Sequence, residues 1–219
     1  MPTVQNPFLY IVPRAEEDII NFRQFIENLD STIKCMQTGG IIFISGPYGS
    51  GKTLILNHLK KKFSKENIEV ISMDFNLNTM FKIKSLPLGK KMIVMIDRFD
   101  LADTLNNETL KKLLDSINEI SSHNVIFIIA IIPELLTRIF ALDEKIKNRA
   151  KILDVPLLNE KEIRELIVSR LNEIRKEKSD SIEPFTEEDI KKIWEKSKGN
   201  PRMVLLLSSA IFDLKMSET

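Results

Sequence analysis

The stretch "GPYGSGKT" at residues 46–53 combines residue types that bind phosphate groups. Its three glycines let the chain turn tightly, with positive φ where needed, so that several backbone N–H groups can face one anion. The Lys52 ammonium supplies a point charge for the β- and γ-phosphates, and the Thr53 hydroxyl is a ligand for Mg²⁺. Because the pattern G-x-x-x-x-G-K-[ST] is complete, the sequence predicts a site for a nucleotide and Mg²⁺.

The context of this loop also fits. An apolar run, "GGIIFIS", precedes it and the helical stretch "TLILNHLKKKF" follows, so that a helix N-terminus adds a positive dipole end. A chance glycine turn before a helix is the alternative, and it does not explain the lysine and threonine. We expect the nucleotide to contact Gly46, Pro47, Tyr48, Gly49, Ser50, Gly51, Lys52, Thr53 and Leu54.

A carboxylate for the metal comes from a second apolar run. "KMIVMID" ends at Asp97, and α/β sheets place their sites at the carboxyl ends of strands. We therefore expect Asp97 to bind Mg²⁺ together with Thr53. The alternative is an aspartate that only ends the strand in a turn.

The residue after Asp97 departs from the usual pattern. ATPases with this glycine-rich loop commonly have a glutamate there, which polarises the attacking water. This chain has Arg98 instead, and an arginine cannot accept a proton. Asp100 is the best substitute, with Glu134 a weaker one; Asp100 as a mere cap of the next segment is the alternative. The stretch "AIIPE" also lacks a polar γ-phosphate sensor. These losses predict slow hydrolysis with binding intact.

Short apolar runs alternate with helical patterns in the first two thirds of the chain. The runs are rich in Ile and Val and apolar on both faces, which indicates strands of a parallel sheet buried between helices. We expect strands at 39–45, 68–74, 91–97, 124–132 and 150–156. We expect helices at 15–33, about 52–66, 107–121 and 133–141.

After Pro156 the pattern is helical only. Asn159 with Glu162 and Thr186 with Asp189 have the spacing of capping boxes. In "GNPR", Asn200 is the expected cap of a third helix and Pro201 its first residue. We therefore predict an α/β nucleotide-binding core over 1–156 and a small all-α lid over 157–219.

Composition restricts the classes of partner. The chain has 219 residues with 32 Lys and Arg against 31 Asp and Glu, so its charge gives no overall attraction to nucleic acid or membranes. Lys60, Lys61 and Lys62 predict a solvated face, with a DNA-contact patch as the alternative. The single cysteine, Cys35, allows no internal disulfide and is expected to be buried. Without a signal-peptide pattern or a spanning run, we expect a soluble cytoplasmic protein.

With these features the chain resembles the AAA+ ATPases, closest to the branch of replication initiators and transposition regulators. The resemblance implies a three-layer P-loop NTPase fold with strand order 5-1-4-3-2, and ATP or ADP with Mg²⁺ as ligands. "NPFLYIVPR" at 6–14 is similar to the family's N-terminal segment that packs against adenine. This implies contacts from Phe8, Tyr10 and Ile11, with anchoring of an N-terminal arm as the alternative.

Two arginines carry further parts of the resemblance. "KIKNRAKILDVP" is similar to the segment that holds the family's arginine finger, so Arg149 is expected to reach a neighbouring subunit's nucleotide, with a plain surface arginine as the alternative. "SKGNPRMVLLL" is similar to the sensor-2 motif, which implies nucleotide contacts from Pro201 and Arg202. Arg202 falls at the second position of its helix, where the dipole disfavours a cation unless an anion faces it.

A second resemblance remains open. The signal-transduction ATPases with numerous domains (STAND) have strands ending much like "DRFD" and lids with a "GNPR"-like start. One hypothesis is an oligomerising ATPase, alone or with another AAA+ subunit, in DNA replication, recombination or transposition. The other is a nucleotide-gated switch that recruits a protein with negligible turnover. We expect no winged helix of the kind usual in initiators, and residues 75–90 are short, so direct DNA binding is left open.

Overall fold

The computed structural model describes residues 5–9, 22–36, 38–66, 68–87 and 89–217. By their contacts these residues form two compact units. The sheet unit contains Gln24–Tyr48 and Lys52–Val155. The helical unit contains Pro156 onward, the loop tip Gly49–Gly51 and the described residues up to Arg23. The sequence instead assigned the N-terminal segment to the core.

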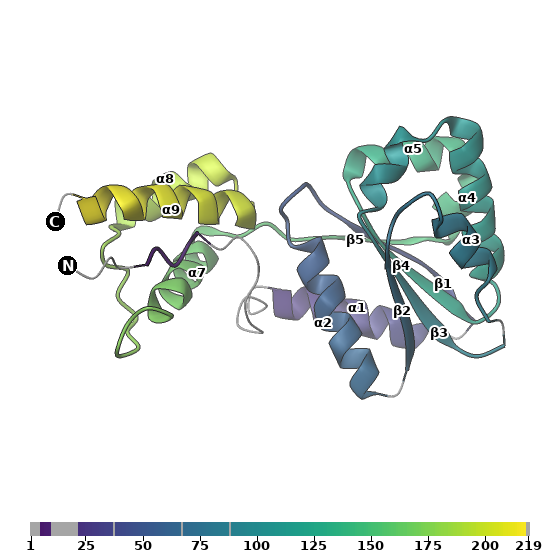
Figure 1. Ribbon diagram of the computed structural model, residues 1–219, viewed down its shortest axis with the longest axis horizontal. Helices are drawn as coiled ribbons and strands as arrows, with labels where there is room; N and C mark the ends of the chain where they lie inside the picture. Colours follow the sequence, from purple (N-terminus) through teal and green to yellow (C-terminus); the bar gives the residue numbers. More distant parts are fainter. Residues whose placement is uncertain (1–4, 10–21, 37, 67, 88, 218–219) are drawn as a thin grey trace. The chain divides into compact units, whose positions relative to one another are not determined.

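The sheet unit is built on five parallel strands (Figure 1). They are β1 (Gly40–Ser45), β2 (Glu69–Asp74), β3 (Met92–Asp97), β4 (Val125–Ile131) and β5 (Lys151–Asp154). Their order is β2-β3-β4-β1-β5, which confirms the predicted order 5-1-4-3-2. Parallel strands all end at one edge, so the residues after β1 and β3 meet there.

Helices cover both faces of this sheet (Figure 1). On one face pack α3 (Thr79–Lys84), α4 (Asn107–Ile120), α5 (Pro133–Leu142) and α6 (Glu144–Arg149), in one apolar cluster with alternate residues of β1, β3 and β4. Helix α2 (Lys52–Lys65) packs on β2, β3 and β4 from the other side. Helix α1 (Arg23–Cys35) is joined to it by the pair of Asp30 with Lys62, 2.9 Å apart.

The three inner strands β1, β3 and β4 fit the expectation of burial on both faces, and the edge strand β2 does not. Every residue of β4 is buried, whereas in β2 only Met73 is. The prediction that the run at 68–74 is buried on both sides is therefore wrong. A strand at the sheet's end has one hydrogen-bonded neighbour and less helix cover, and its polar positions reach solvent.

The helical unit consists of α7 (Glu160–Asn172), α8 (Glu187–Ser197) and α9 (Pro201–Ser217). Both predicted capping boxes are present at the starts of α7 and α8. The Asn200 side chain accepts the amides of Arg202 and Met203, as expected for a cap of α9. The helices enclose an apolar core of their own.

Residues far apart in the chain meet in this helical core. Phe8 is buried there, with its ring centroid 5.5 Å from that of Phe185 and 5.9 Å from that of Phe212. The Asn6 amide donates to Ser209 Oγ at 3.0 Å and to Asp213 Oδ1 at 2.8 Å in α9. For Phe8 the structure favours the anchoring alternative over a contact with adenine.

Two smaller observations concern the surface. Cys35, at the end of α1, is exposed, so the expectation of a buried cysteine is wrong. Its place in the last turn of a helix on the sheet's flank puts it outside the apolar stripe that faces the core. Among the helices that the structure describes, none is both long and apolar enough to cross a bilayer.

Candidate nucleotide-binding site

The loop between β1 and α2 has the backbone that the glycine pattern predicts. Gly49 has φ of 81° and Gly51 has φ of 98°, in the region that side chains disfavour. Gly46 is not in that region; its amide instead donates to the Ile131 carbonyl of β4 at 3.1 Å. The loop therefore starts with a hydrogen bond to the sheet and then turns at Gly49 and Gly51, where glycine takes positive φ without strain.

Lys52, the first residue of α2, lies in this loop with only 8% of its surface exposed. Its ammonium donates to the carbonyl of Gly46 at 2.6 Å and to that of Pro47 at 3.1 Å. Burial lowers the pKa of Lys52 below its usual value, because water no longer solvates the charge. The carboxylates of Asp100, Asp97 and Glu134 oppose this lowering of the Lys52 pKa.

Asp97 ends β3 at the carboxyl edge of the sheet, as predicted. It stands in register with Asp74 on β2, and its Oδ1 accepts the Arg98 amide at 2.8 Å. Thr53 is exposed in the first turn of α2. Among the described residues no three carboxylate, histidine or cysteine side chains are grouped to hold a metal, so Mg²⁺ here would need phosphate oxygens as further ligands.

Arg98 takes up the position where a glutamate was expected, and its backbone is unusual. Its φ of 53° is left-handed, a conformation that costs a non-glycine residue free energy. The exposed guanidinium lies 3.7 Å from the Asp74 carboxylate, beside the end of β2. The Arg98 side chain thus forms an ion pair with Asp74, at the end of the neighbouring strand β2.

Asp100 lies in the 3₁₀ helix η2 (Phe99–Thr104), directly after Arg98 and Phe99. Its Oδ1 accepts the amide of Ile132 at 2.7 Å, so it bonds the residue after β4 rather than capping its own segment. Burial raises the pKa of Asp100 above its usual value. Lys52 and the Ile132 amide oppose this rise in the Asp100 pKa.

Glu134 follows in the first turn of α5 and is exposed. Its charge adds to the rise in the Asp100 pKa, which places it near the same edge of the sheet. Sequence reasoning missed the part played by Ile132, whose side chain carries no polar group. Only the topology, which puts β4 between β1 and β3, brings its amide to Asp100.

The residues of the loop fit a phosphate group. Ser50 is fully buried, and within the described part of the chain its hydroxyl has no hydrogen-bond partner, which is costly unless a ligand supplies one. The buried Lys52 ammonium likewise gains from an anion. A Cβ added at Gly51 would lie 3.0 Å from the Phe22 ring and would crowd it, and the positive φ of Gly51 also disfavours a side chain there.

The predicted residues outside the loop are placed as follows. Arg149 ends α6, and its Nη1 donates to Asn118 Oδ1 at 2.6 Å. Pro201 and Arg202 begin α9, where the Arg202 amide donates to the Gly49 carbonyl at 3.3 Å within the helical unit. Tyr10 and Ile11 lie outside the described residues. Tyr48 lies within the loop, and Leu54 lies in the first turn of α2.

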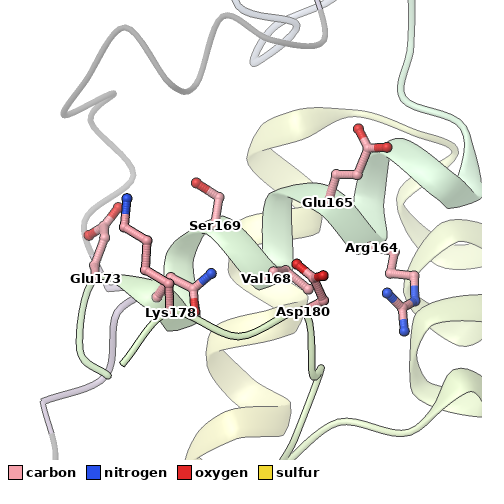
Figure 2. Close-up of a pocket in the computed structure, with 8 residues that line it drawn as sticks. Arg164, Glu165, Val168, Ser169, Glu173, Lys178 and Asp180 are labelled. Atoms are coloured by element: carbon pink, nitrogen blue, oxygen red, sulfur yellow. The ribbon is translucent and has the colours of Figure 1, made fainter. Parts of the chain in front are cut away.

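A separate hollow of about 740 Å³ lies on the helical unit, between α7 and the loop after it (Figure 2). Its lining mixes cations, carboxylates and neutral groups. The lining residues are Arg164, Glu165, Val168, Ser169, Asn172, Glu173, Lys178 and Asp180. None of the predicted nucleotide-binding residues is among them, so this hollow is distinct from the candidate site.

Comparison with known proteins gives the family. The family model for novel STAND NTPase 3 matches residues 26–173, and the chain belongs to this family. An uncharacterized HTH-type transcriptional regulator of Methanocaldococcus jannaschii is 30% identical over 122 residues, which are 55% of this chain and 29% of the relative. The chain thus spans less than a third of that relative's length.

Solved structures share the fold. The Walker-type ATPase PABY2304 of Pyrococcus abyssi matches with a TM-score of 0.63 and 15% identity, over 93% of this chain and 70% of that one. The Aeropyrum pernix ORC1 protein in complex with DNA has a TM-score of 0.61 and 15% identity, over 97% and 64%. Thermotoga maritima RuvB has 0.57 and 20%, over 93% and 65%. The family match confirms the predicted resemblance to STAND NTPases, and the solved structures confirm the predicted P-loop NTPase fold.

Proposed function

Starting from membership of this STAND NTPase family, we propose that the chain binds ATP with Mg²⁺ at residues 46–53 and hydrolyses it slowly. Its ATP-bound state would act as a switch that recruits a protein partner. The observation that carries the proposal is the Lys52 ammonium, buried inside a loop in which Gly49 and Gly51 take positive φ. Two carboxylates act electrostatically on this ammonium, Asp97 at the end of β3 and Asp100 in η2, and both raise the Lys52 pKa.

Lys52 would hold the triphosphate. In the loop its ammonium is satisfied by two backbone carbonyls, those of Gly46 and Pro47. A phosphate oxygen is a stronger acceptor than a carbonyl because it carries charge. Binding would therefore move the ammonium from the carbonyls to the β- and γ-phosphates, and would raise the Lys52 pKa again.

Thr53 and Asp97 would hold the metal. The Thr53 hydroxyl lies in the first turn of α2 and the Asp97 carboxylate ends β3, so both stand at the carboxyl edge of the sheet. Mg²⁺ bound there neutralises charge on the β- and γ-phosphate oxygens. The remaining residues of the loop orient the phosphates through their backbone N–H groups.

Asp100 would accept the proton of the attacking water. Its Oδ1 is fixed by the Ile132 amide, and within the described residues its Oδ2 makes no hydrogen bond. Burial raises its pKa, which makes it a better base than an ordinary aspartate. Arg98 cannot take this part, so we expect slow turnover that suits a switch better than a motor.

Two arginines, Arg202 and Arg149, would contact the bound nucleotide. Arg202 at the start of α9 would contact the phosphates within the same chain, and Arg149 would reach a neighbouring copy or another AAA+ subunit.

A second candidate function is an oligomeric factor in a DNA transaction. The 30% identity to a protein named as an HTH-type transcriptional regulator favours it.

Calorimetric titration with ATP–Mg²⁺ tests the binding. We expect Lys52→Ala to weaken ATP binding at least about 100-fold, since a charge-assisted contact to phosphate is lost. Lys61→Ala, an exposed lysine on the same helix, is the matched control. ATP binding by Lys52→Ala at wild-type affinity would show that the site is assigned wrongly.

Phosphate release tests the hydrolysis, and running it with and without duplex DNA separates the two functions. The switch predicts turnover that DNA leaves unchanged and that Asp100→Asn reduces about 100-fold. Stimulation by DNA supports the second candidate instead. Wild-type turnover in Asp100→Asn would remove Asp100 as the base.

A further inference from the structure

Arg138 on α5 makes an unusual number of hydrogen bonds to one short segment. Its Nη1 donates to the Asp103 carbonyl at 2.8 Å and to Asp103 Oδ1 at 2.9 Å. Its Nη2 donates to the Leu105 carbonyl at 2.7 Å and to Asn107 Oδ1 at 2.8 Å, and its Nε donates to Asn107 Oδ1 at 3.3 Å. The guanidinium therefore grips the end of η2 and the start of α4.

The other end of the same segment is fixed to α5 as well. Asp100 accepts the amide of Ile132, the residue that precedes α5. Beneath it, Phe99 is fully buried, with its ring centroid 5.1 Å from that of Phe75. Residues 98–107 thus run from β3 to α4 as a strap that is bonded near one end to Ile132, just before α5, and near the other end to Arg138, in the middle of α5.

The segment between these two bonds has little rigidity of its own. It is a single stretch of 3₁₀ helix, whose hydrogen bonds are poorer than those of an α-helix. It begins at Arg98 in a strained left-handed conformation, which favours local rearrangement unless neighbours prevent it. At the α4 end of the segment, the five hydrogen bonds from Arg138 prevent this rearrangement.

We propose that Arg138 is a positioning residue, which holds the 98–107 strap on α5 so that the Asp100 carboxylate stays on the Ile132 amide and faces the phosphates. This rests on the proposed function, in which Asp100 acts on the attacking water. Arg138 itself touches neither nucleotide nor metal. It acts only through the strap.

A planar guanidinium is needed for this. Its donors form a fixed fork that serves two carbonyls and two side chains at once, whereas a lysine ammonium is a single point charge on a flexible stem. Lysine keeps the charge and most of the packing but cannot make the whole set of bonds. Arg138→Lys therefore separates the positioning role from a general contribution of charge to the fold.

The first measurement does not depend on ATP. Hydrogen exchange of the Ile132 amide is compared in wild type, Arg138→Lys and Arg138→Gln, with Arg164→Lys on the helical unit as control. We expect exchange at Ile132 to rise about 10-fold or more in both Arg138 variants, with the amides of β1 and β4 unchanged. Unchanged exchange at Ile132 in both variants overturns the proposal.

The second measurement follows catalysis. We expect turnover to fall about 10- to 100-fold in Arg138→Lys while the Kd for ATP changes less than about two-fold, since only the base is misplaced. The pH midpoint of turnover should also move, because Asp100 would lose the Ile132 amide while Lys52, Asp97 and Glu134 still face it. An equal loss of binding and turnover would mean a merely structural role.

The two proposals fail in different ways. If wild type does not bind ATP, the proposed function is wrong, and the Ile132 exchange still decides whether Arg138 holds the strap. If wild type binds and hydrolyses ATP but Arg138→Lys matches it in exchange, turnover and pH profile, only the positioning role is wrong.

Discussion

The guanidinium of Arg149 donates to both oxygens of Asn118, to Oδ1 at 2.6 Å and to the carbonyl at 3.3 Å. The residue expected to reach a neighbouring subunit is thus held by the last turn of α4 in its own chain. For Arg149 to act on another copy's nucleotide, these bonds must first break. This makes Asn118 a competitor for the arginine.

The competition gives a paired prediction on self-association. We expect Arg149→Ala to weaken ATP-dependent self-association, because the finger is lost, and Asn118→Ala to strengthen it a few-fold, because the finger is freed. Light scattering with and without ATP measures both. If neither variant changes the association constant, Arg149 is only a surface arginine.

Arg98 allows a prediction on stability. Its φ of 53° disfavours any side chain, so Arg98→Gly should raise the free energy of unfolding by about 0.5–1 kcal/mol despite the entropy that glycine adds to the unfolded chain. Arg98→Ala, which removes the side chain but keeps the strain, is the control. Urea unfolding followed by circular dichroism compares them, and a glycine variant less stable than the alanine one contradicts the argument.

The same position allows a prediction on turnover. Arg98→Glu supplies the carboxylate that ATPases of this class commonly carry, so we expect faster phosphate release if the missing glutamate limits hydrolysis. A rate that stays level or falls would mean that the water is handled elsewhere. Repeating the measurement on Arg98→Glu with Asp100→Asn shows whether the two carboxylates act independently.

Asp143 allows a prediction on pH. Its buried carboxylate caps α6 through the Ile146 amide and accepts the Lys111 ammonium at 2.6 Å. Burial alone would raise the pKa of Asp143, but the bonds from Lys111 and Ile146 prevail and hold it below its usual value. A lowered pKa means stability that is present above the unfolded pKa near 3.9 and is lost as pH falls through the folded one.

We therefore expect Asp143→Ala to cost about 1–3 kcal/mol of unfolding free energy at pH 7, through loss of the cap and the ion pair. The difference from wild type should shrink below about pH 4, where the wild-type carboxyl takes up its proton. Glu144→Ala, the exposed neighbour, is the control. A difference that stays constant from pH 7 to pH 3 contradicts the assignment.

Phe8 allows a prediction on the helical unit. Because its ring is 1% exposed between Phe185 and Phe212, Phe8→Ala should destabilise this unit by about 3–5 kcal/mol. Leu9→Ala, at a side chain that is 60% exposed, is the matched control. Trp194, the single tryptophan, lies in α8, so its fluorescence during urea unfolding reports on this unit. Equal midpoints for the two variants would exclude the anchor.

What the sequence predicted well is local. The loop at 46–53 and the capping boxes at Asn159 and Thr186 each need only a few neighbouring residues, and all stand as expected. The strand order followed from the resemblance. Burial of β2 was predicted wrongly because a strand's place at the edge of a sheet is decided by the other strands.

What the sequence missed depends on residues that are distant in the chain. The bond between Asp100 and Ile132 spans 32 residues, and the one from Arg138 to Asp103 spans 35. An arginine in an amphipathic helix has the pattern of a solvated residue, so nothing local marked Arg138. Cys35 was expected to be buried because of its residue type, but it is exposed, since residue type alone does not determine burial.

The bonds from Asn6 to α9 have a consequence for biosynthesis. The two partners are separated by 203 residues, so the early segment leaves the ribosome long before its docking helix has been made. The sheet unit, whose strands all lie between them, can assemble first. The helical unit must await α9, so translation that stalls before α9 would leave Phe8 exposed to water, where chaperones and proteases recognise such chains.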